Sequence, residues 1–124
     1  MSKNYKNCVF ARLIVGAPAI FHGEDESGNL VWLRTSRVDS IEILDNIIRF
    51  QTRSSEYVCG LKAGVIEFSN ASRNLEPFFV EMPLHFAGDY MGRFQEFNFG
   101  KIRSVHSYGD RVSVTTTLGQ TYLL

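Results

Sequence analysis

Residues 37–61 consist of three short runs in which apolar and polar side chains alternate, and this pattern constrains the fold more than any other feature of the chain. Alternation with a period of two places every second side chain on one face of a strand. Asp45-Asn46 separates the first two runs, and both residues tolerate the left-handed backbone of a tight hairpin turn. The segment therefore predicts a three-stranded antiparallel meander, with strands at 37–44, 47–52 and 56–61.

The end of the chain repeats this design at a spacing of 64 residues, from 38 to 102. Residues 38–41 fall on residues 102–105, which have the same order of apolar and polar side chains. The spacing predicts an internal meander repeat, 37–61 and 100–124, within a single domain that spans 1–124. Duplication and shared strand chemistry both account for such a likeness. A meander of this size cannot bury both of its faces alone, so the two copies are expected to pack together or to join one sheet.

The rest of the chain contains further strand patterns and one segment of a different kind. We expect strands at 8–15, 17–22, 30–34 and 78–82, an exposed turn at 23–29, and a strand end at Pro83. Residues 62–76 favour an irregular or short-helical insert, because apolar residues at helical spacing are mixed with glycine, serine and asparagine. The predicted fold class is mainly β: a single domain of antiparallel meanders, arranged as a sandwich or a small barrel.

Composition and charge narrow the classes of function. The 124 residues contain 13 Lys and Arg and 13 Asp and Glu, so no net positive field favours nucleic-acid binding. We recognise neither a secretory leader nor an apolar run long enough to cross a bilayer, and we expect a cytoplasmic protein without a membrane partner. Cys8 and Cys59 have no metal-ligand spacing, which predicts buried free thiols.

Catalytic motifs are missing from the sequence. It has no P-loop, GxSxG, HExxH, GxGxxG or EF-hand pattern. Its three histidines, His22, His85 and His106, are far apart, and the carboxylates of residues 24–26 lie in a polar turn. The sequence therefore favours a protein that is not an enzyme and that uses no metal or cofactor.

Arginines near aromatic and hydroxyl residues suggest a ligand site. Arginine binds phosphate with two parallel hydrogen bonds, and aromatic rings stack on bases, so the mixture suits a phosphate-bearing nucleotide. The candidate ligand-binding residues are Arg34, Thr35, Ser36, Arg37, Tyr90, Phe94, Phe97, Arg103 and Arg111. Arg37 and Arg49 have the parity of cross-strand neighbours. Two other interpretations stay open: the arginines lie on solvated strand faces, and the Thr35-Ser36 hydroxyls satisfy backbone groups at a bend.

The runs LRTSRVDSIE, at 33–42, and IIRFQTRSSEYV, at 47–58, resemble small phage-encoded proteins that counter bacterial defence. Among these the nearest is the anti-Thoeris family, which sequesters cyclic ADP-ribose signals. The resemblance covers residues 30–60. It implies a viral sponge in the host cytoplasm, which binds a cyclic nucleotide between subunits without cleaving it. In that family arginines meet the phosphates and aromatic rings stack on the base.

A protein-binding inhibitor, similar to an anti-CRISPR, or another interaction module is the alternative function. It would use the aromatic segment 85–99, because Tyr, Phe, Met and Arg are enriched at protein interfaces. Under both functions we expect a homo-oligomer, since meanders leave edge strands and this segment is rich in rings that a monomer would expose.

Overall fold

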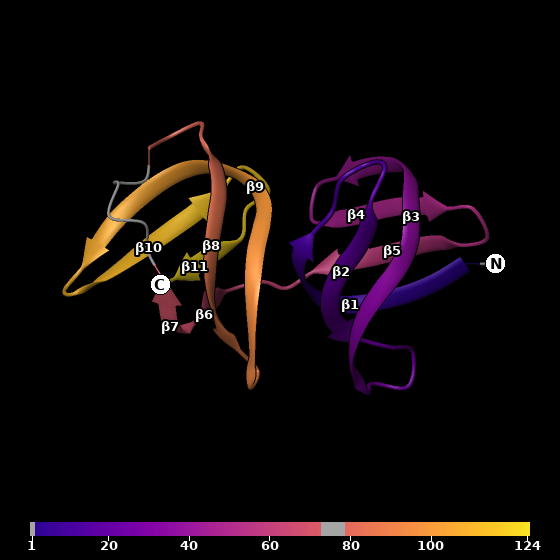
Figure 1. Cartoon of the computed structure of the whole chain (residues 1–124), viewed down its shortest axis with the longest axis horizontal. Coiled ribbons are helices and arrows are strands. Elements are labelled where there is room, and N and C mark those ends of the chain that lie inside the picture. Colours follow the sequence, from indigo (N-terminus) through magenta and orange to yellow (C-terminus); the bar gives the residue numbers. More distant parts are fainter. Residues whose placement is uncertain (1, 73–78) are drawn as a thin grey trace. The chain divides into compact units, whose positions relative to one another are not determined.

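The structure is a computed structural model that describes residues 2–72 and 79–124, and in these residues it contains strands and no helix (Figure 1). This confirms the mainly β fold class. The strands are β1 Ser2–Arg12, β2 Pro18–Glu24, β3 Leu30–Leu44, β4 Ile47–Thr52, β5 Glu56–Leu61, β6 Val65–Glu67, β7 Ser69–Ser72, β8 Pro83–Tyr90, β9 Arg93–Tyr108, β10 Arg111–Thr116 and β11 Thr121–Leu123.

The chain divides into two compact units, unit 1 (Met1–Ala63) and unit 2 (Gly64–Leu124). In unit 1 each strand from β1 to β5 pairs antiparallel with the next along the chain. β1 also pairs with β5, and this ladder is parallel. Successive strands alternate in direction, so the first and fifth run the same way and the ring closes through a parallel pair. Unit 1 is therefore a small closed barrel.

Unit 2 closes its ring in the same way, with β6 and β7 together in the role of β1. β6 pairs parallel with β11, and β7 pairs antiparallel with β8. β8 to β11 then follow one another as an antiparallel meander. The registers also make Phe50 of β4 equivalent to Val114 of β10, because each lies opposite a buried tyrosine of the next strand, Tyr57 or Tyr122.

A bulge in β3 lets this strand pair with β2 through its first half and with β4 through its second half. The β2–β3 register skips one residue of β2, Ala19, and two residues of β3, Thr35 and Ser36. Such an insertion bends a strand and increases its twist. Residues 30–34 and 37–44, predicted as two strands, are therefore one bent strand.

β9 has the equivalent bulge, where Phe99 and Gly100 lie against Leu84 of β8. Gly100 has a φ of 86°, a left-handed conformation that glycine adopts without steric cost. A Cβ atom at this position would lie 3.3 Å from Cβ of Thr116. Gly100 therefore gives β9 the bend that brings it from β8 to β10.

Aromatic rings fill both barrels. In unit 1 the rings of Phe50 and Tyr57 stack with their centroids 4.7 Å apart, and Phe21 meets both of them edge-on. In unit 2 the ring of Phe68 lies 4.7–5.8 Å from the rings of Phe86, Tyr90, Phe97 and Tyr122. Most rings of the aromatic segment 85–99 thus belong to the core of unit 2.

Two predictions for residues 62–82 are wrong where the structure describes them. The segment expected to be irregular or short-helical contains strands β6 and β7 instead, and residues 73–76 of that prediction lie outside the described residues. The expected strand at 78–82 is a turn from residue 79 onward, with residue 78 outside the described residues. Glu81, at a φ of 78°, donates its backbone N–H to the carbonyl of Ile102, so this segment cannot extend as a strand.

The register of the β3–β4 hairpin corrects one further expectation. Asp45 has a φ of 50° in the predicted turn, and strands β4 and β5 have the predicted bounds. This two-residue turn sets Arg49 opposite Glu42, whereas Arg37 lies opposite Pro18 of β2. Arg37 and Arg49 are therefore not cross-strand neighbours.

Cys8 and Cys59 are free and fully buried, as predicted. The Cys8 side chain hydrogen-bonds that of Cys59, and this contact and burial raise the pKa of the Cys59 thiol. The Cys59 thiol therefore stays protonated inside unit 1. Among the described residues, no helix has the length and apolar character to span a membrane.

Candidate functional site

The predicted ligand residue Thr35 is buried, and the β3 bulge occupies its hydroxyl. Thr35 Oγ1 accepts the backbone N–H of Ala19 at 3.0 Å and donates to the carbonyl of Ser36 at 2.7 Å. The hydroxyl thus satisfies the amide that the bulge leaves without a ladder partner.

Tyr90 and Phe97, predicted to wall a ligand pocket, lie in the core of unit 2. Phe97 is 2% exposed, and its ring stacks on that of Phe86 at 5.3 Å. Tyr90 is also buried, and its desolvation raises the pKa of the phenol. Both rings contact Phe68 and stabilise the barrel.

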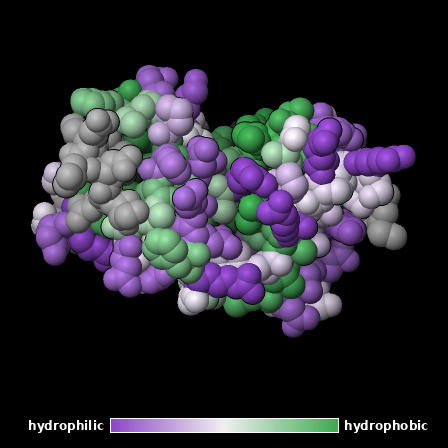
Figure 2. All heavy atoms as spheres, in the orientation of Figure 1, coloured by the Kyte–Doolittle hydropathy of each residue, from purple (hydrophilic) through white to green (hydrophobic). Residues whose placement is uncertain are grey.

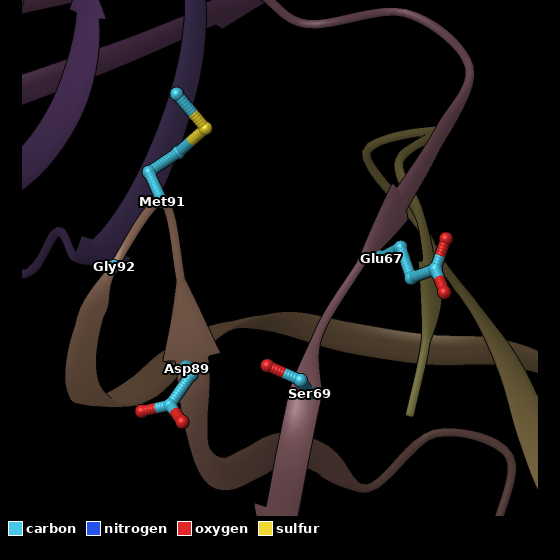
Figure 3. Close-up of a pocket in the computed structure, with 5 residues that line it drawn as sticks. All are labelled: Glu67, Ser69, Asp89, Met91 and Gly92. Atoms are coloured by element: carbon cyan, nitrogen blue, oxygen red, sulfur yellow. The ribbon is translucent and has the colours of Figure 1, made fainter.

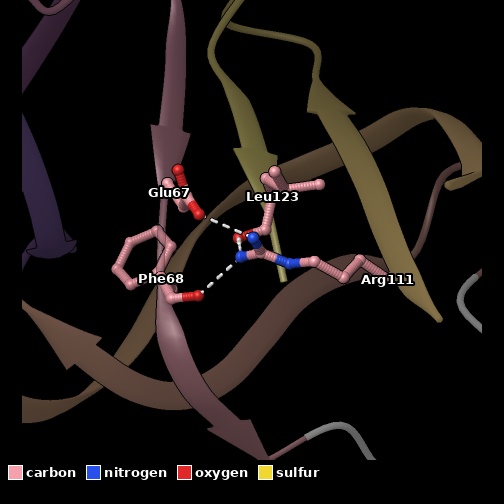
Figure 4. Close-up of polar contacts among 4 residues, drawn as sticks. All are labelled: Glu67, Phe68, Arg111 and Leu123. Carbon is pink, nitrogen blue, oxygen red and sulfur yellow. Dashed lines mark hydrogen bonds and ion pairs between the residues drawn. The ribbon is translucent and has the colours of Figure 1, made fainter. Parts of the chain in front are cut away.

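Arg111, a predicted phosphate ligand, binds three groups of unit 2 (Figure 4). Its guanidinium pairs with the Glu67 carboxylate at 2.6 Å and donates to the carbonyls of Phe68 at 2.8 Å and Leu123 at 3.3 Å. Arg111 therefore fastens β10 to β11 and to the β6–β7 segment.

The remaining predicted residues are exposed. Arg34, Ser36 and Arg37 follow one another along β3 in unit 1, around the bulge. Phe94 and Arg103 lie on β9 in unit 2, before and after its bend. Of the predicted aromatic residues, Phe94 alone presents its ring to solvent, with 64% of its surface exposed.

Unit 2 contains a groove of about 510 Å³ that sequence analysis missed (Figure 3). It is lined by Glu67, Ser69, Asp89, Met91 and Gly92. The first three come from β6, β7 and the end of β8, and the last two form the β8–β9 turn. Met91 and Gly92 both have positive φ, which allows a two-residue turn and leaves the Met91 side chain exposed.

Asp89 is the middle member of a row that crosses three strands of unit 2. Ser69 of β7 and Phe94 of β9 are its partners on either side. Directly opposed residues project from the same face of a sheet, so the three side chains share the outer face of the barrel. Asn70 donates from Nδ2 to Asp89 Oδ2 at 2.9 Å and fixes the carboxylate.

Among the residues that the structure describes, the groove has one unpaired negative charge beside apolar surface. Arg111 neutralises Glu67, whereas Asp89 forms no ion pair with any residue that the structure describes. Met91 and Phe94 lie next to it and are both more than half exposed. Figure 2 shows that hydrophobic and hydrophilic residues are interspersed on the visible surface of the molecule. Such a site favours a cation next to an apolar group and repels a phosphate.

Unit 1 has a counterpart of this row in Lys6, Glu24 and Leu30, which are paired across β1, β2 and β3. Leu30, in the place of Phe94, is 58% exposed. Asn7, in the place of Asn70, has the same left-handed backbone and donates to the Glu24 carboxylate. The sequence signal for this repeat is an aromatic residue two positions before an asparagine, Tyr5-Lys6-Asn7 and Phe68-Ser69-Asn70.

No group of three or more metal-ligating side chains occurs within residues 2–72 and 79–124. Comparison of the chain with protein-family models, with curated proteins and with solved structures found no match.

Proposed function

We propose that the protein is a protein-binding module, the alternative that the sequence offered. In this proposal the row Ser69–Asp89–Phe94 of unit 2 holds a segment of a partner protein that carries a basic side chain next to an apolar one. The proposal rests on one observation: the exposed ring of Phe94 lies beside the carboxylate of Asp89, which forms no ion pair with any described residue.

Energetics support this choice of ligand. Covering an exposed phenylalanine stabilises a complex by about 1.5–3 kcal/mol, and aromatic anchors are common at the centres of protein interfaces. Asp89 is held by Asn70, and Phe94 lies on a hairpin strand, so binding orders few additional groups. A lysine or arginine of the bound segment that pairs with Asp89 adds a charge-assisted hydrogen bond and orients that segment.

Sequestration of a cyclic nucleotide stays a prediction that this site does not favour. Asp89 would repel a phosphate, and the polar or aromatic groups of Thr35, Tyr90, Phe97 and Arg111 are occupied within their units. The exposed guanidiniums of Arg34 and Arg37 are the features that a nucleotide would use instead.

A peptide array tests the proposal. We expect short peptides with Arg or Lys beside Leu or Phe to bind in fluorescence polarisation, and the same peptides with Glu in place of the basic residue to bind about 10-fold more weakly or not at all. Failure of every basic and apolar peptide would overturn the proposal. A cyclic ADP-ribose compound that raises the free energy of unfolding by about 2.7 kcal/mol at 100 times its dissociation constant would support sequestration instead. Thermal unfolding with and without the compound measures this gain.

Variants locate the binding surface. Phe94→Ser should weaken peptide binding about 10- to 100-fold, the equivalent of losing a buried ring. Asp89→Asn should weaken it less and should reduce its dependence on salt. Phe79→Ser is the matched control, because Phe79 is a similarly exposed ring of unit 2 outside the row. Equal losses in Phe79→Ser and Phe94→Ser would contradict the assignment of the site.

A further inference from the structure

The outer face of β3, β4 and β5 in unit 1 ends in an apolar row. Leu44, Ile47 and Gly60 are paired across the three strands. Leu44 is 47% exposed and Ile47 is 41% exposed, and Ile43 at the hairpin end is exposed as well. Gly60 has no side chain, so a flat strip of backbone lies beside Ile47.

Unit 2 shows that the fold does not require an apolar side chain at this place. The residue equivalent to Ile47 is Arg111, which likewise directly follows the two-residue turn of its hairpin. Arg111 folds back onto its own unit and binds Glu67 and two carbonyl groups. Ile47 has no such intramolecular role to explain its exposure.

Charges of both signs border the apolar row. Glu42 lies opposite Arg49 in the next row of the same face, and both residues are exposed. Nε of Arg49 lies 3.9 Å from the carboxylate of Glu56. A two-fold axis parallel to the strands, between β3 and β4, would set Glu42 of each chain against the partner's Arg49, so the surface is complementary to itself.

We propose that this outer face, made by Glu42, Leu44, Ile47, Arg49 and Gly60, is a self-association surface that binds a second copy of the chain about a two-fold axis. The partner's Ile47 lies against Leu44, the partner's Leu44 lies against Ile47, and the four charges form two intermolecular pairs at the rim. The surface is separate from the row around Phe94, so a failure of either proposal leaves the other standing.

Ile47→Lys tests the apolar row. Sedimentation of the unmodified chain should show a dimer whose population rises with concentration, and Ile47→Lys should be a monomer throughout. Ile14→Lys is the control, because Ile14 is an apolar residue of unit 1 that is at least as exposed as Ile47 but lies outside this face, and it should leave the dimer intact. A monomer mass for the unmodified chain at all concentrations up to about 1 mM would overturn the proposal.

A mixing experiment separates association from folding. Glu42→Arg and Arg49→Glu alone should each raise the dissociation constant at least about 10-fold, because like charges then meet across the axis. An equimolar mixture of the two variants should associate better than either alone, since only the mixed dimer restores both pairs. Mixing cannot repair a pair within one chain, so a mixture that stays as monomeric as its components would refute the two-fold arrangement.

Discussion

In unit 1 the bend of the long strand depends on a hydroxyl group, and in unit 2 the equivalent bend depends on a glycine. Thr35 supplies an oxygen for the unpaired amide of Ala19. Gly100 supplies a left-handed backbone. The backbone requirement is the same in both barrels, and different side chains meet it, so the identity of a residue at the bend says little about a ligand.

Other parts of the backbone are equivalent in the two units. Val38 exchanges two backbone hydrogen bonds with residues 16–17, and Ile102 does the same with residues 81–82, all at 2.8–3.0 Å. Each of these turns leads into a strand that begins with proline. Both turns also leave large apolar side chains exposed: Ile14 and Val15 in unit 1, and Phe79, Val80 and Met82 in unit 2.

The differences between the units identify positions at which the fold does not require one kind of side chain. Ile47 and Arg111 occupy equivalent places, one exposed and apolar, the other bound to its own unit. Leu30 and Phe94 both stay exposed beside a fixed carboxylate. A position at which the two barrels carry chemically different side chains is a better candidate for binding a partner than a position that each barrel needs in order to close its ring of strands.

Substitution at the equivalent positions Phe68 and Tyr5 should give the largest contrast between the units. Phe68→Ala removes the ring that contacts four others and should lower the free energy of unfolding by about 3–5 kcal/mol. Tyr5→Ala should cost roughly 1–2 kcal/mol, because Tyr5 is only half-buried. Denaturant unfolding measures both values, and Phe94→Ala is the exposed control. Equal costs for Phe68 and Tyr5 would contradict the difference in core packing.

High pH should destabilise the units in sequence. Cys59 in unit 1 and Tyr122 in unit 2 both have raised pKa values. The contact with Cys8 and burial raise the pKa of the Cys59 thiol. Burial, and to a smaller extent the nearby Tyr90, raise the pKa of the Tyr122 phenol. When folding raises the pKa of an acid, the free energy of unfolding is unaffected as long as the pH stays below the pKa of the same group in the unfolded chain. That ordinary pKa is 9.0 for the thiol and 10.0 for the phenol. Above that value the unfolded state ionises first, and stability falls by about 1.4 kcal/mol per pH unit for each group.

Hydrogen exchange between pH 8 and 11, corrected for the intrinsic rate, would follow this order. Amides of unit 1 should lose protection from about pH 9 and amides of unit 2 from about pH 10, the ordinary pKa values of the two groups. Cys59→Ala should remove the earlier loss and leave the later one. Loss of protection in unit 2 before unit 1 would show that another group governs alkaline unfolding.

The guanidinium of Arg111 should contribute to stability and not to ligand binding. Arg111→Met keeps the aliphatic stem but leaves two carbonyls and the Glu67 carboxylate without their donor, and should cost about 1–3 kcal/mol. Arg34→Met, an exposed arginine of unit 1, is the matched control and should change stability by less than about 0.5 kcal/mol. Thermal unfolding compares the two variants, and equal stabilities would show that the Arg111 contacts are replaced by water at no cost.

Local chemistry in the sequence was sufficient to predict the hairpin of β3 and β4. Alternation and the Asp45-Asn46 turn both act over a few residues, and they predicted the end of β3 and the bounds of β4 correctly. The start of β3 at residue 30 was not predicted, because a bulge joins two runs that the sequence separates. β6 and β7 were missed because their partners, β11 and β8, are distant in sequence and supply the pairing that the polar residues 69–72 do not indicate. The parallel strand pair that closes each ring was not predicted either, because its two strands are far apart in the sequence.

The candidate site was predicted in part, and spacing explains where the prediction failed. Phe94 and Phe97 are three positions apart on one strand, so their rings point to opposite faces and only one of them can be exposed. Arg111 binds a carboxylate 44 positions earlier, a partner that no local pattern reveals. The groove around Asp89 depends on the register between β7 and β8, which the sequence does not determine.

Alanine at the two strand bends should give the smallest contrast and the most direct test of how each unit solves the same problem. Gly100→Ala places a Cβ atom at a φ of 86° and 3.3 Å from Thr116, so it should cost about 1–2 kcal/mol. Ser36→Ala, at the equivalent position of unit 1, should be nearly neutral, because only the backbone carbonyl of Ser36 takes part in the hydrogen bond with Thr35. The denaturant concentration at the midpoint of unfolding measures both effects, provided that the slope of the free energy of unfolding against denaturant concentration is unchanged. A neutral Gly100→Ala would mean that β9 bends without a left-handed residue, and the two bulges would then differ in geometry as well as in chemistry.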